Sequence, residues 1–487
     1  MLRFFRPRGI AWLSLQPDLE RGNDDPARAP RSLHLVVAAI VILASCGSDA
    51  EGPENSASSS LPFNSSSASS SEPVREADTI APTTETRAER SSTTAPLPTS
   101  FDVVYLAPDG GDDRTGDSPE QARITLGAAL EVLNPGGVIV LQPGTYPPLR
   151  IVGLAGTTEA PIHIEAAAGV EFRGEGYSAD AGVLIRDSEH VEIVGMRVRQ
   201  ALWGVYIENS HHITVRGLDV ADIGQEGIRV KAGSTNVRID SNIVADTGRR
   251  TDNGRANGEG IYVGTGSPGG VDVIDRVMII NNRVMRTTDE AIDIKRPSTN
   301  VDIIGNIVSD VVTNTSGAIV IHLNGDQDGN PNINIERNVI RNVTRSSPHR
   351  DGNCIVSQVE IRIVNNVLHN CQHRGIFLRG SGGIASVLHN TFLNAGEIGS
   401  VVSEGRGMQV ASRNNLGTGG EENRQAAGDV YVAADRGNYR LTDDAASELS
   451  SAPSVGVVDD LNGDARPTDG PVTFGAVERD HGDDSDS

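Results

Sequence analysis

Most of the chain beyond residue 180 repeats one short pattern, in which a small residue precedes three positions of a strand. The first and third of these positions are apolar and the middle one varies, as in a β-strand with one face toward a core. Copies begin 22–35 residues apart, which indicates stacked coils of one repeat domain rather than separate domains. The copies occupy residues 182–185, 204–207, 227–230, 260–263, 291–294, 318–321, 353–356 and 375–378.

A second aliphatic segment in each coil ends in glycine or asparagine, the residues that adopt positive φ at the lowest cost. Stacked asparagines can also hydrogen-bond to one another along the stack. Two columns in one register predict an all-β fold, a right-handed parallel β-helix with strands about 4.8 Å apart. The second column contains Gly195, Gly217, Asn242, Asn282, Asn306, Asn338, Asn366, Asn390 and Asn415.

The β-helix is expected to span residues 101–425, with a strand at 102–106 and a short capping helix at 124–133 over its first coil. Residues 426–478 are expected to form an irregular C-terminal cap, and residues 479–487 a disordered acidic tail. Within the cap, residues 460–464 have the spacing of a calcium loop but lack the acidic residue that ends an EF-hand. A metal loop and a turn rich in Asp and Asn both remain open.

Residues 1–46 are expected to be an export signal, because Arg28 and Arg31 precede an apolar run at 35–44 that is too short to span a bilayer. Residues 43–46 resemble the lipobox of bacterial lipoproteins, which implies acylation of Cys46; an ordinary signal peptide is the alternative. Residues 47–100 are rich in Ser, Thr and Pro and predict a flexible tether. We therefore expect an exported domain, held on a membrane through a lipid anchor only, or an extracellular one.

The formal net charge of −23 argues against nucleic acid as a partner, since phosphate backbones are bound by basic surfaces. The chain has three cysteines, too few for a disulfide scaffold. Cys354 and Cys371 lie within one coil and are either bridged or two small core residues. We expect a monomer.

The outward positions of the repeat carry the candidate chemistry. In the segment 289–295, Asp293 and Lys295 alternate with inward isoleucines and therefore point outward. Glu226, Glu259 and Glu290 occupy equivalent positions in three consecutive coils. Like charges side by side are unfavourable, so this column predicts either a bound Ca²⁺ or a strongly solvated edge.

Cationic and aromatic side chains share this outer face. Such a combination suits a sugar chain that carries carboxylates, so an acidic polysaccharide is the predicted partner. The expected contacts are Arg229, Lys231, Lys295, His322, Trp203, Tyr206, Tyr262 and Asp293.

Two stretches carry a family resemblance. The opening at 105–146 resembles the start of secreted right-handed β-helix proteins of the pectate-lyase-like superfamily. Residues 257–264, 290–295 and 300–306 look like the central coils of the β-helix alginate and chondroitin lyases. That resemblance implies calcium ligands including Glu290, a lysine base at Lys295, and an arginine one coil later, where this chain has His322.

The sequence-based hypothesis is β-elimination on a uronate polysaccharide. Lys295 would remove the C5 proton, which requires a lowered lysine pKa. Tyr262 or His322 would return a proton to the leaving oxygen, while Ca²⁺ or Arg229 with His322 neutralises the carboxylate. The alternatives are a non-catalytic carbohydrate-binding or adhesin-type surface protein, and a glycoside hydrolase that uses Asp289 and Asp293. An outward lysine is otherwise simply solvated.

Overall fold

The computed structural model describes residues 100–178, 180–250, 257–266, 272–295, 298–322, 331–404, 407–420, 422–425 and 430–478. All of them fall within one compact unit, Ser48–Ser487. The expected export signal, the acylation at Cys46, the tether up to residue 99 and the acidic tail lie outside the described residues. None of the helices that the structure describes is long and apolar enough to cross a membrane.

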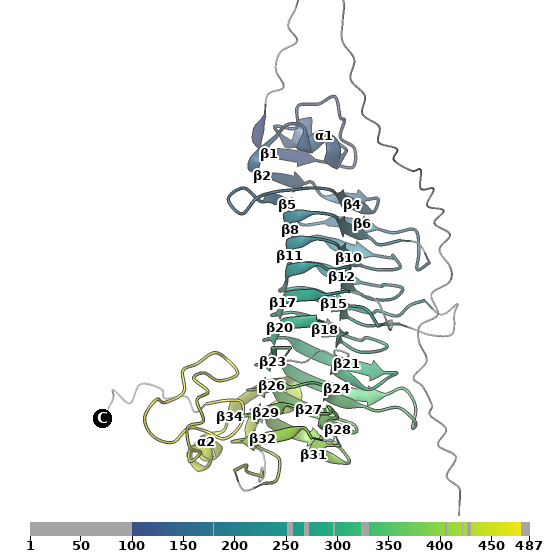
Figure 1. The fold of residues 1–487 in the computed structure, drawn as a ribbon. Helices are drawn as coiled ribbons and strands as arrows, with labels where there is room; N and C mark the ends of the chain where they lie inside the picture. Colours follow the sequence, from purple (N-terminus) through teal and green to yellow (C-terminus); the bar gives the residue numbers. More distant parts are fainter. Residues whose placement is uncertain are drawn as a thin grey trace, which may run out of the picture. The chain divides into compact units, whose positions relative to one another are not determined.

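Three parallel sheets wind around a common core, and each complete coil contributes one strand to each sheet (Figure 1). The largest, the twelve-stranded sheet, follows the chain in stacking order. Its strands are β1 (Phe101–Leu106), β2 (Leu133–Leu141), β5 (Ile162–Ala166), β8 (Glu189–Val194), β11 (His211–Arg216), β14 (Thr235–Asp240), β17 (Ile274–Ile280), β20 (Ser298–Ile304), β23 (Ile333–Glu336), β26 (Ile361–Val364), β29 (Ile384–Leu388) and β32 (Gln409–Arg413).

The anchor sheet, named for the repeat pattern that it contains, has ten strands. Its strands are β4 (Leu149–Val152), β7 (Val183–Arg186), β10 (Val205–Glu208), β13 (Ile228–Lys231), β16 (Ile261–Val263), β19 (Ile292–Ile294), β22 (Gly317–Ile321), β25 (Asn353–Ser357), β28 (Arg374–Leu378) and β31 (Gly399–Ser403).

The third sheet also has ten strands. They are β3 (Gly144–Tyr146), β6 (Val170–Arg173), β9 (Arg197–Arg199), β12 (Asp219–Ala221), β15 (Ile243–Ala245), β18 (Arg283–Met285), β21 (Ile307–Thr313), β24 (Val339–Arg345), β27 (Val367–Cys371) and β30 (Thr391–Ala395). The predicted parallel β-helix is therefore confirmed.

The inward aliphatic residues of all three sheets form one continuous core, so that Ile228, Ile261, Ile292 and Ile319 lie in one fully buried column. Pairing along the anchor sheet follows the predicted register from β7 to β22. In the next coil the predicted register is wrong by one residue, because Val320 pairs with Val356. Asn353 pairs with Gly317, so the small-residue position of this coil is Cys354 and not Asn353.

The first coil is closed by a short helix, α1 (Leu126–Leu130), preceded by the 3-10 turn η1 (Pro119–Gln121). The hydroxyl of Thr125 accepts a hydrogen bond from the backbone N–H of Ala128, which caps the helix start. Ala129 packs into the core of the stack. The helix is shorter than the expected 124–133, because β2 already begins at Leu133 and carries the chain back into the sheet.

The predicted asparagine column is a hydrogen-bonded ladder, as expected, but not a column of positive-φ residues. Each asparagine Oδ1 accepts from the backbone N–H and from the Nδ2 of the asparagine one coil before, at 2.8–3.1 Å from Asn242 to Asn415. The positive φ belongs to the preceding residue, such as Ser241, Asn281 and Gly305. Gly195 and Gly217 are thus equivalent to Ser241, one position before the ladder.

The C-terminal segment packs along the side of the stack instead of only closing its end, which corrects the expected cap. It contains β33 (Tyr431–Ala433), η2 (Ala434–Arg436), β34 (Asn438–Leu441) and α2 (Asp443–Leu449), and it lies beside the later coils (Figure 1). Its Tyr431, Tyr439 and Leu441 form a small second core with Val367 and Leu416. The shared apolar contacts hold this segment against the outside of the third sheet.

Arg466 joins this segment to the stack. Its fully buried guanidinium pairs with Glu478 at 2.7 Å and donates to the Asn365 side chain at 3.0 Å. Asp460, which opens the calcium-like spacing, accepts from the backbone N–H groups of Asn462 and Asp464 at 2.8 and 2.9 Å. Residues 460–464 therefore form a turn organised by Asp460.

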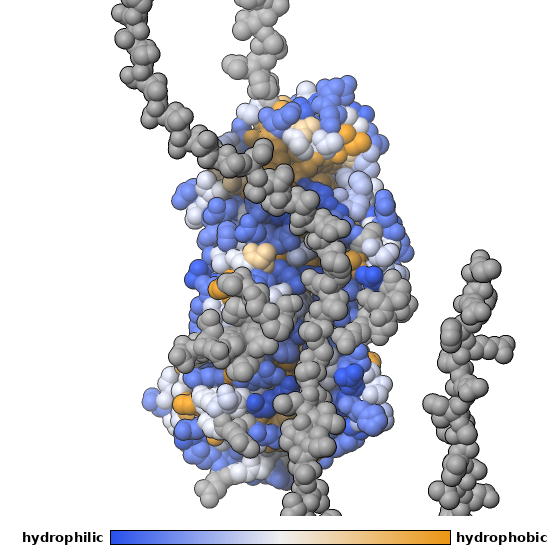
Figure 2. All heavy atoms as spheres, turned by 45° about the vertical axis from the view of Figure 1, so that its right-hand side comes forward, coloured by the Kyte–Doolittle hydropathy of each residue, from blue (hydrophilic) through white to orange (hydrophobic). Residues whose placement is uncertain are grey.

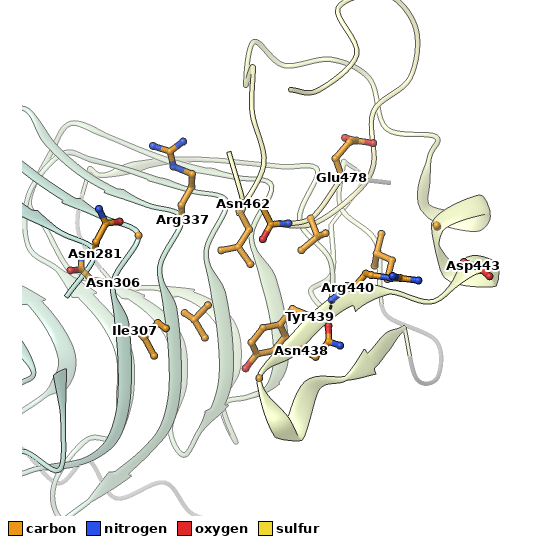
Figure 3. A pocket seen from close by; sticks show the side chains of 17 residues that line it. Asn281, Asn306, Ile307, Arg337, Asn438, Tyr439, Arg440, Asp443, Asn462 and Glu478 are labelled. Carbon is orange, nitrogen blue, oxygen red and sulfur yellow. Dashed lines mark hydrogen bonds between the residues drawn. The ribbon is translucent and has the colours of Figure 1, made fainter. Parts of the chain in front are cut away.

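A cavity of about 640 Å³ lies between part of the C-terminal segment and the flank of the β-helix (Figure 3). Asn281 and Arg337 line it from the coils, and Asn438, Tyr439 and Asn462 line it from the segment. None of its lining residues comes from the anchor sheet, so it is separate from the predicted site. On the other side of the third sheet, Cys354 and Cys371 are joined by a disulfide, with their Cα atoms 5.5 Å apart.

Figure 2 shows a largely hydrophilic surface, with an apolar area near the end that holds the first coils. Exposed apolar side chains of those coils include Val103, Ile124 and Val152. Along the rest of the stack, exposed apolar side chains also occur, among them Ile243 and Val312.

Replacing Asn306 with alanine is expected to lower the free energy of unfolding by roughly 2–4 kcal/mol, because it removes side-chain partners of buried polar groups on Asn282 and Asn338. Urea unfolding followed by circular dichroism measures the change. The control is Asn370→Gly, which removes an exposed asparagine and keeps a residue that tolerates positive φ. Equal stabilities of the two variants would show that the buried ladder does not support the stack.

Candidate functional site

Three charged or titratable side chains meet on the outer face of the anchor sheet. Asp293 projects from the middle of β19, Lys295 follows the same strand, and His322 follows β22 one coil later. The Lys295 Nζ lies 2.7 Å from Asp293 Oδ2, and the His322 Nε2 lies 3.1 Å from Asp293 Oδ1. The two nitrogens are 3.2 Å apart, so both side chains converge on one carboxylate.

Asp293 is completely buried, whereas the side chains of Lys295 and His322 keep 19% and 27% of their exposure. Burial alone would raise the pKa of Asp293, but the charges and hydrogen bonds of Lys295 and His322 outweigh it and lower that pKa. Burial would lower the pKa of Lys295, but attraction to Asp293 and Glu290 raises it above its ordinary value. The structure thus favours a Lys295–Asp293 ion pair.

The neighbouring carboxylates behave in the opposite way. Burial, and then repulsion from Glu226, Asp289 and Asp293, raises the pKa of Glu259 well above its ordinary range. Burial and repulsion from Asp289 and Asp293 raise the pKa of Glu290 likewise. These carboxyl groups favour the protonated form in the folded protein.

Thr315 and the turn after β21 hold two of these acids in place. The Thr315 hydroxyl donates to Glu290 and lies 3.1 Å from Asp289 Oδ1, and the backbone N–H of Asn314 donates to the same oxygen at 3.2 Å. Burial raises the pKa of Asp289 in spite of these hydrogen bonds. Asp289 and Glu290 therefore form a rigid pair of neighbouring carboxyl groups.

The carboxylate set has the chemistry of a site for a hard divalent cation. One oxygen each of Glu259, Asp289 and Glu290 lies within 4.8 Å of the others, as do ligand atoms of Glu290, Asp293 and His322. The Oε2 of Glu259 is buried and has no hydrogen-bond partner within the described ranges. Oxygen ligands in a buried acidic cluster suit Ca²⁺, so the residues present fit that ion.

A guanidinium stacked on aromatic rings lies two strands before Asp293. The Cζ of Arg229 is 4.8 Å from the ring centre of Trp203, 5.1 Å from Tyr206 and 5.8 Å from Tyr262. Lys295 approaches the Tyr262 ring to 5.6 Å. Each contact is a cation–π interaction, which holds the positive charges in fixed positions along this face.

The structure brings the sequence-predicted residues together in one region of β10 to β22. Two of the three predicted metal ligands, Glu259 and Glu290, lie together with Asp289. The third, Glu226, lies 3.9 Å from Arg229. The alternative of a strongly solvated edge is wrong, because Glu226, Glu259 and Glu290 are only 2–6% exposed. Lys231 lies beside the Tyr262 ring at 5.4 Å.

Two contributors were not expected from the sequence. Thr315 and Asn314 sit in the turn before β22, and nothing in the repeat pattern distinguishes them from other turn residues. Asp289 was predicted only as a residue of a hydrolase. Its position next to Glu290 in the sequence could have indicated that it belongs to the carboxylate cluster. The lowered lysine pKa that the lysine-base hypothesis requires is also contradicted, since the acids around Lys295 raise its pKa.

Comparison with known proteins bears on the fold. The family model described as a right handed beta helix region matches residues 181–346. The solved pectate lyase Pel9A is 17% identical and superposes with a TM-score of 0.54 over 78% of this chain and 97% of that one. The chain is a right-handed parallel β-helix with a pectate-lyase-like fold.

Other solved structures resemble this β-helix protein less well in superposition. An alginate lyase from Paenibacillus sp. str. FPU-7 is 21% identical, with a TM-score of 0.46 over 57% of this chain and 93% of that chain. A lacto-N-biosidase from Eubacterium ramulus is 13% identical, with a TM-score of 0.44 over 63% and 68% of the two chains. No curated protein matches the sequence. These likenesses concern the fold alone.

The Glu259→Gln variant is expected to gain stability relative to the natural protein as pH rises from about 5 to about 8 in a chelating buffer. The folded protein holds a proton on Glu259 at pH values where the unfolded chain has released it, because the folded pKa is raised. The contribution of Glu259 to the free energy of unfolding therefore falls as pH rises, and glutamine, which does not titrate, removes this pH dependence.

Urea titrations across this pH range measure the difference between the two unfolding free energies. Glu189→Gln is the matched control, because the Glu189 side chain is half exposed and its replacement should leave the pH dependence unchanged. Parallel pH profiles for the natural protein and Glu259→Gln would contradict the assignment of a raised pKa.

Proposed function

We propose that the β-helix domain acts on a polysaccharide that contains uronate, and that it cleaves this chain by β-elimination. The observation that supports this most directly is the Asp293–Lys295–His322 group, in which two nitrogen side chains converge on a buried carboxylate. The fold shared with the pectate lyase Pel9A supports a polyuronate as the substrate class.

The cations of the site suit the charge that develops in β-elimination. Removal of the C5 proton of a uronate places negative charge on the adjacent carboxylate, and fixed positive groups stabilise that charge. Lys295 and Arg229 are such groups, held at Asp293 and at the aromatic rings of Trp203 and Tyr206. Lys295 would therefore pair with the substrate carboxylate as an ammonium ion.

We assign the base to His322 rather than to Lys295. A lysine must be neutral to accept a proton, and the acids near Lys295 raise its pKa. Imidazole is the side chain that accepts and releases protons near neutral pH. The Nε2 of His322 lies 3.1 Å from Asp293 Oδ1 and 3.2 Å from the Lys295 Nζ. In the tautomer that carries its proton on Nε2, the Nδ1 is left to accept the C5 proton, and the charge of Asp293 stabilises the protonated ring.

Tyr262 is the proposed proton donor to the leaving oxygen. It precedes Asp293 by one strand in the same outward column. Burial and the nearby Asp293 raise the pKa of its hydroxyl, so that the phenol keeps its proton until the C4–O4 bond breaks. A Ca²⁺ ion held by Glu259, Asp289 and Glu290 would supply further positive charge for the substrate carboxylate.

A glycoside hydrolase is the second candidate, and one observation favours it. Burial and neighbouring acids raise the pKa of Glu290, whereas Lys295 and His322 lower that of Asp293 in spite of its burial. A protonated and an ionised carboxyl group side by side is the arrangement that acid–base hydrolysis of a glycosidic bond requires. In this alternative Glu290, and not Asp289, would be the acid.

The decisive assay incubates the protein with alginate, pectate and glycosaminoglycans, with and without Ca²⁺. Ultraviolet absorbance of an unsaturated uronate supports the lyase. Reducing ends without that absorbance support the hydrolase, and retention of the polymer without any product supports a carbohydrate-binding surface protein.

His322→Ala is expected to lower kcat by about 10²–10⁴-fold, the typical contribution of a general base. The exposed His349→Ala is the matched control and should retain full activity. Lys295→Arg keeps the positive charge and should retain measurable turnover, whereas Lys295→Ala should not. Loss of all turnover in Lys295→Arg together with full activity of His322→Ala would return the base to Lys295.

A further inference from the structure

The outer face of the anchor sheet changes character beyond His322. In the outward column, Asp293 is followed by Val320, Val356 and Phe377 in successive strands. These three apolar side chains are buried together in a cluster of their own, outside the main core. The charged centre is therefore bordered by an apolar stretch that leads to β28.

The column of acidic residues also changes there. In the next three strands, the residues equivalent to Glu290 are Gly317, Asn353 and Arg374. The Cζ of Arg374 lies 4.1 Å above the Phe377 ring, and that of the exposed Arg379 lies 5.9 Å from it. Two guanidinium groups thus share one aromatic ring.

The polar contacts of Arg374 are mostly long for a buried guanidinium. It lies 3.5 Å from Asp351 and Asn353 and 3.4 Å from Glu404, with only the His373 contact short at 2.7 Å. Its buried Nε has no hydrogen-bond partner among the residues that the structure describes. Well-formed guanidinium–carboxylate pairs are bidentate at about 2.7–2.9 Å, so the charge of Arg374 is incompletely matched.

Glu404 is the partner that a ligand can replace. Its side chain is 58% exposed, while that of Arg374 is only 9% exposed. An incoming carboxylate can take the place of Glu404 against Arg374 and Arg379. Because the guanidinium of Arg374 is already buried, only the incoming carboxylate has to lose water to complete this pairing.

The same arrangement occurs on the other side of the charged centre, where Arg229 lies over Trp203 and Tyr206. Strands β13 and β28 are five strand spacings apart in the anchor sheet, or about 24 Å at roughly 4.8 Å each. We propose that Arg374, Phe377 and Arg379 form a distal subsite that binds a second carboxylate of a long anionic polysaccharide. This inference rests on the proposed function and extends it to substrates long enough to span both guanidinium sites.

The test compares the full chain with its Arg379→Ala and Arg374→Gln variants in binding alginate and pectate polymers and their trisaccharides, by calorimetry in a Ca²⁺ buffer. The distal subsite predicts at least about a tenfold loss of polymer affinity, or 1.4 kcal/mol, and no change for trisaccharides. Arg413→Ala, an exposed arginine of the twelve-stranded sheet, should change neither.

Because Arg379 is exposed, its variant should unfold at the temperature of the natural protein, which separates binding from folding. Unchanged polymer affinity in Arg379→Ala and Arg374→Gln would overturn the subsite, and so would an equal loss for polymer and trisaccharide. A natural protein that binds the polymer without cleaving it would refute the lyase, while the length dependence of binding would still support the subsite.

Discussion

Parallel strands stacked about 4.8 Å apart place equivalent side chains of successive coils in direct contact, and the whole domain depends on this. Inside the stack it is favourable, because columns such as Ile228, Ile261 and Ile292 bury aliphatic surface against one another. At the turns, the same stacking buries peptide N–H groups, and the side chains of the asparagine ladder accept hydrogen bonds from them. Each amide oxygen accepts two N–H groups from the preceding coil, as Asn282 does for Asn242.

On the outer face the same stacking brings like charges together. Glu226, Glu259 and Glu290 are buried side by side instead of extending into water, which costs stability unless protons or a cation compensate. Natural folds retain such costs mainly where function needs them. The stacking contact that stabilises the core therefore also makes this acidic cluster the strongest evidence for a functional site.

The periodic features could be predicted from the sequence, because a β-helix turns sequence spacing into spatial position. The fold, the pairing from β7 to β22 and the grouping of Asp293 with Lys295 and His322 follow from spacing alone. The errors were local. Glycine and asparagine both tolerate positive φ, so Gly195 and Gly217 were placed in the same column as the asparagines of the ladder. The residues that share the positive φ of these glycines are instead Ser241 and Asn281, one position before the ladder asparagines.

Burial and pairing could not be predicted, because alternation assigns a side chain to a face without saying what covers it. Outward residues such as Tyr262 and Asp293 are almost inaccessible. The C-terminal segment has no repeat, and its position depends on single contacts, such as that of Arg466 with Asn365, between residues far apart in the chain. Thr315, which orders Asp289 and Glu290, has no signal in a repeat pattern either.

Asp293 determines what its neighbours can do. With a valine there, as at position 320 in the next coil, the largest attraction that opposes the effect of burial on the Lys295 pKa would be lost. The carboxylate of Asp293 lies 2.7 Å from the Lys295 ammonium, and their attraction raises the pKa of Lys295. The Nε2 of His322 lies 3.1 Å from the other oxygen of this carboxylate. One buried acid thus makes the lysine a fixed cation and places the histidine beside the same carboxylate.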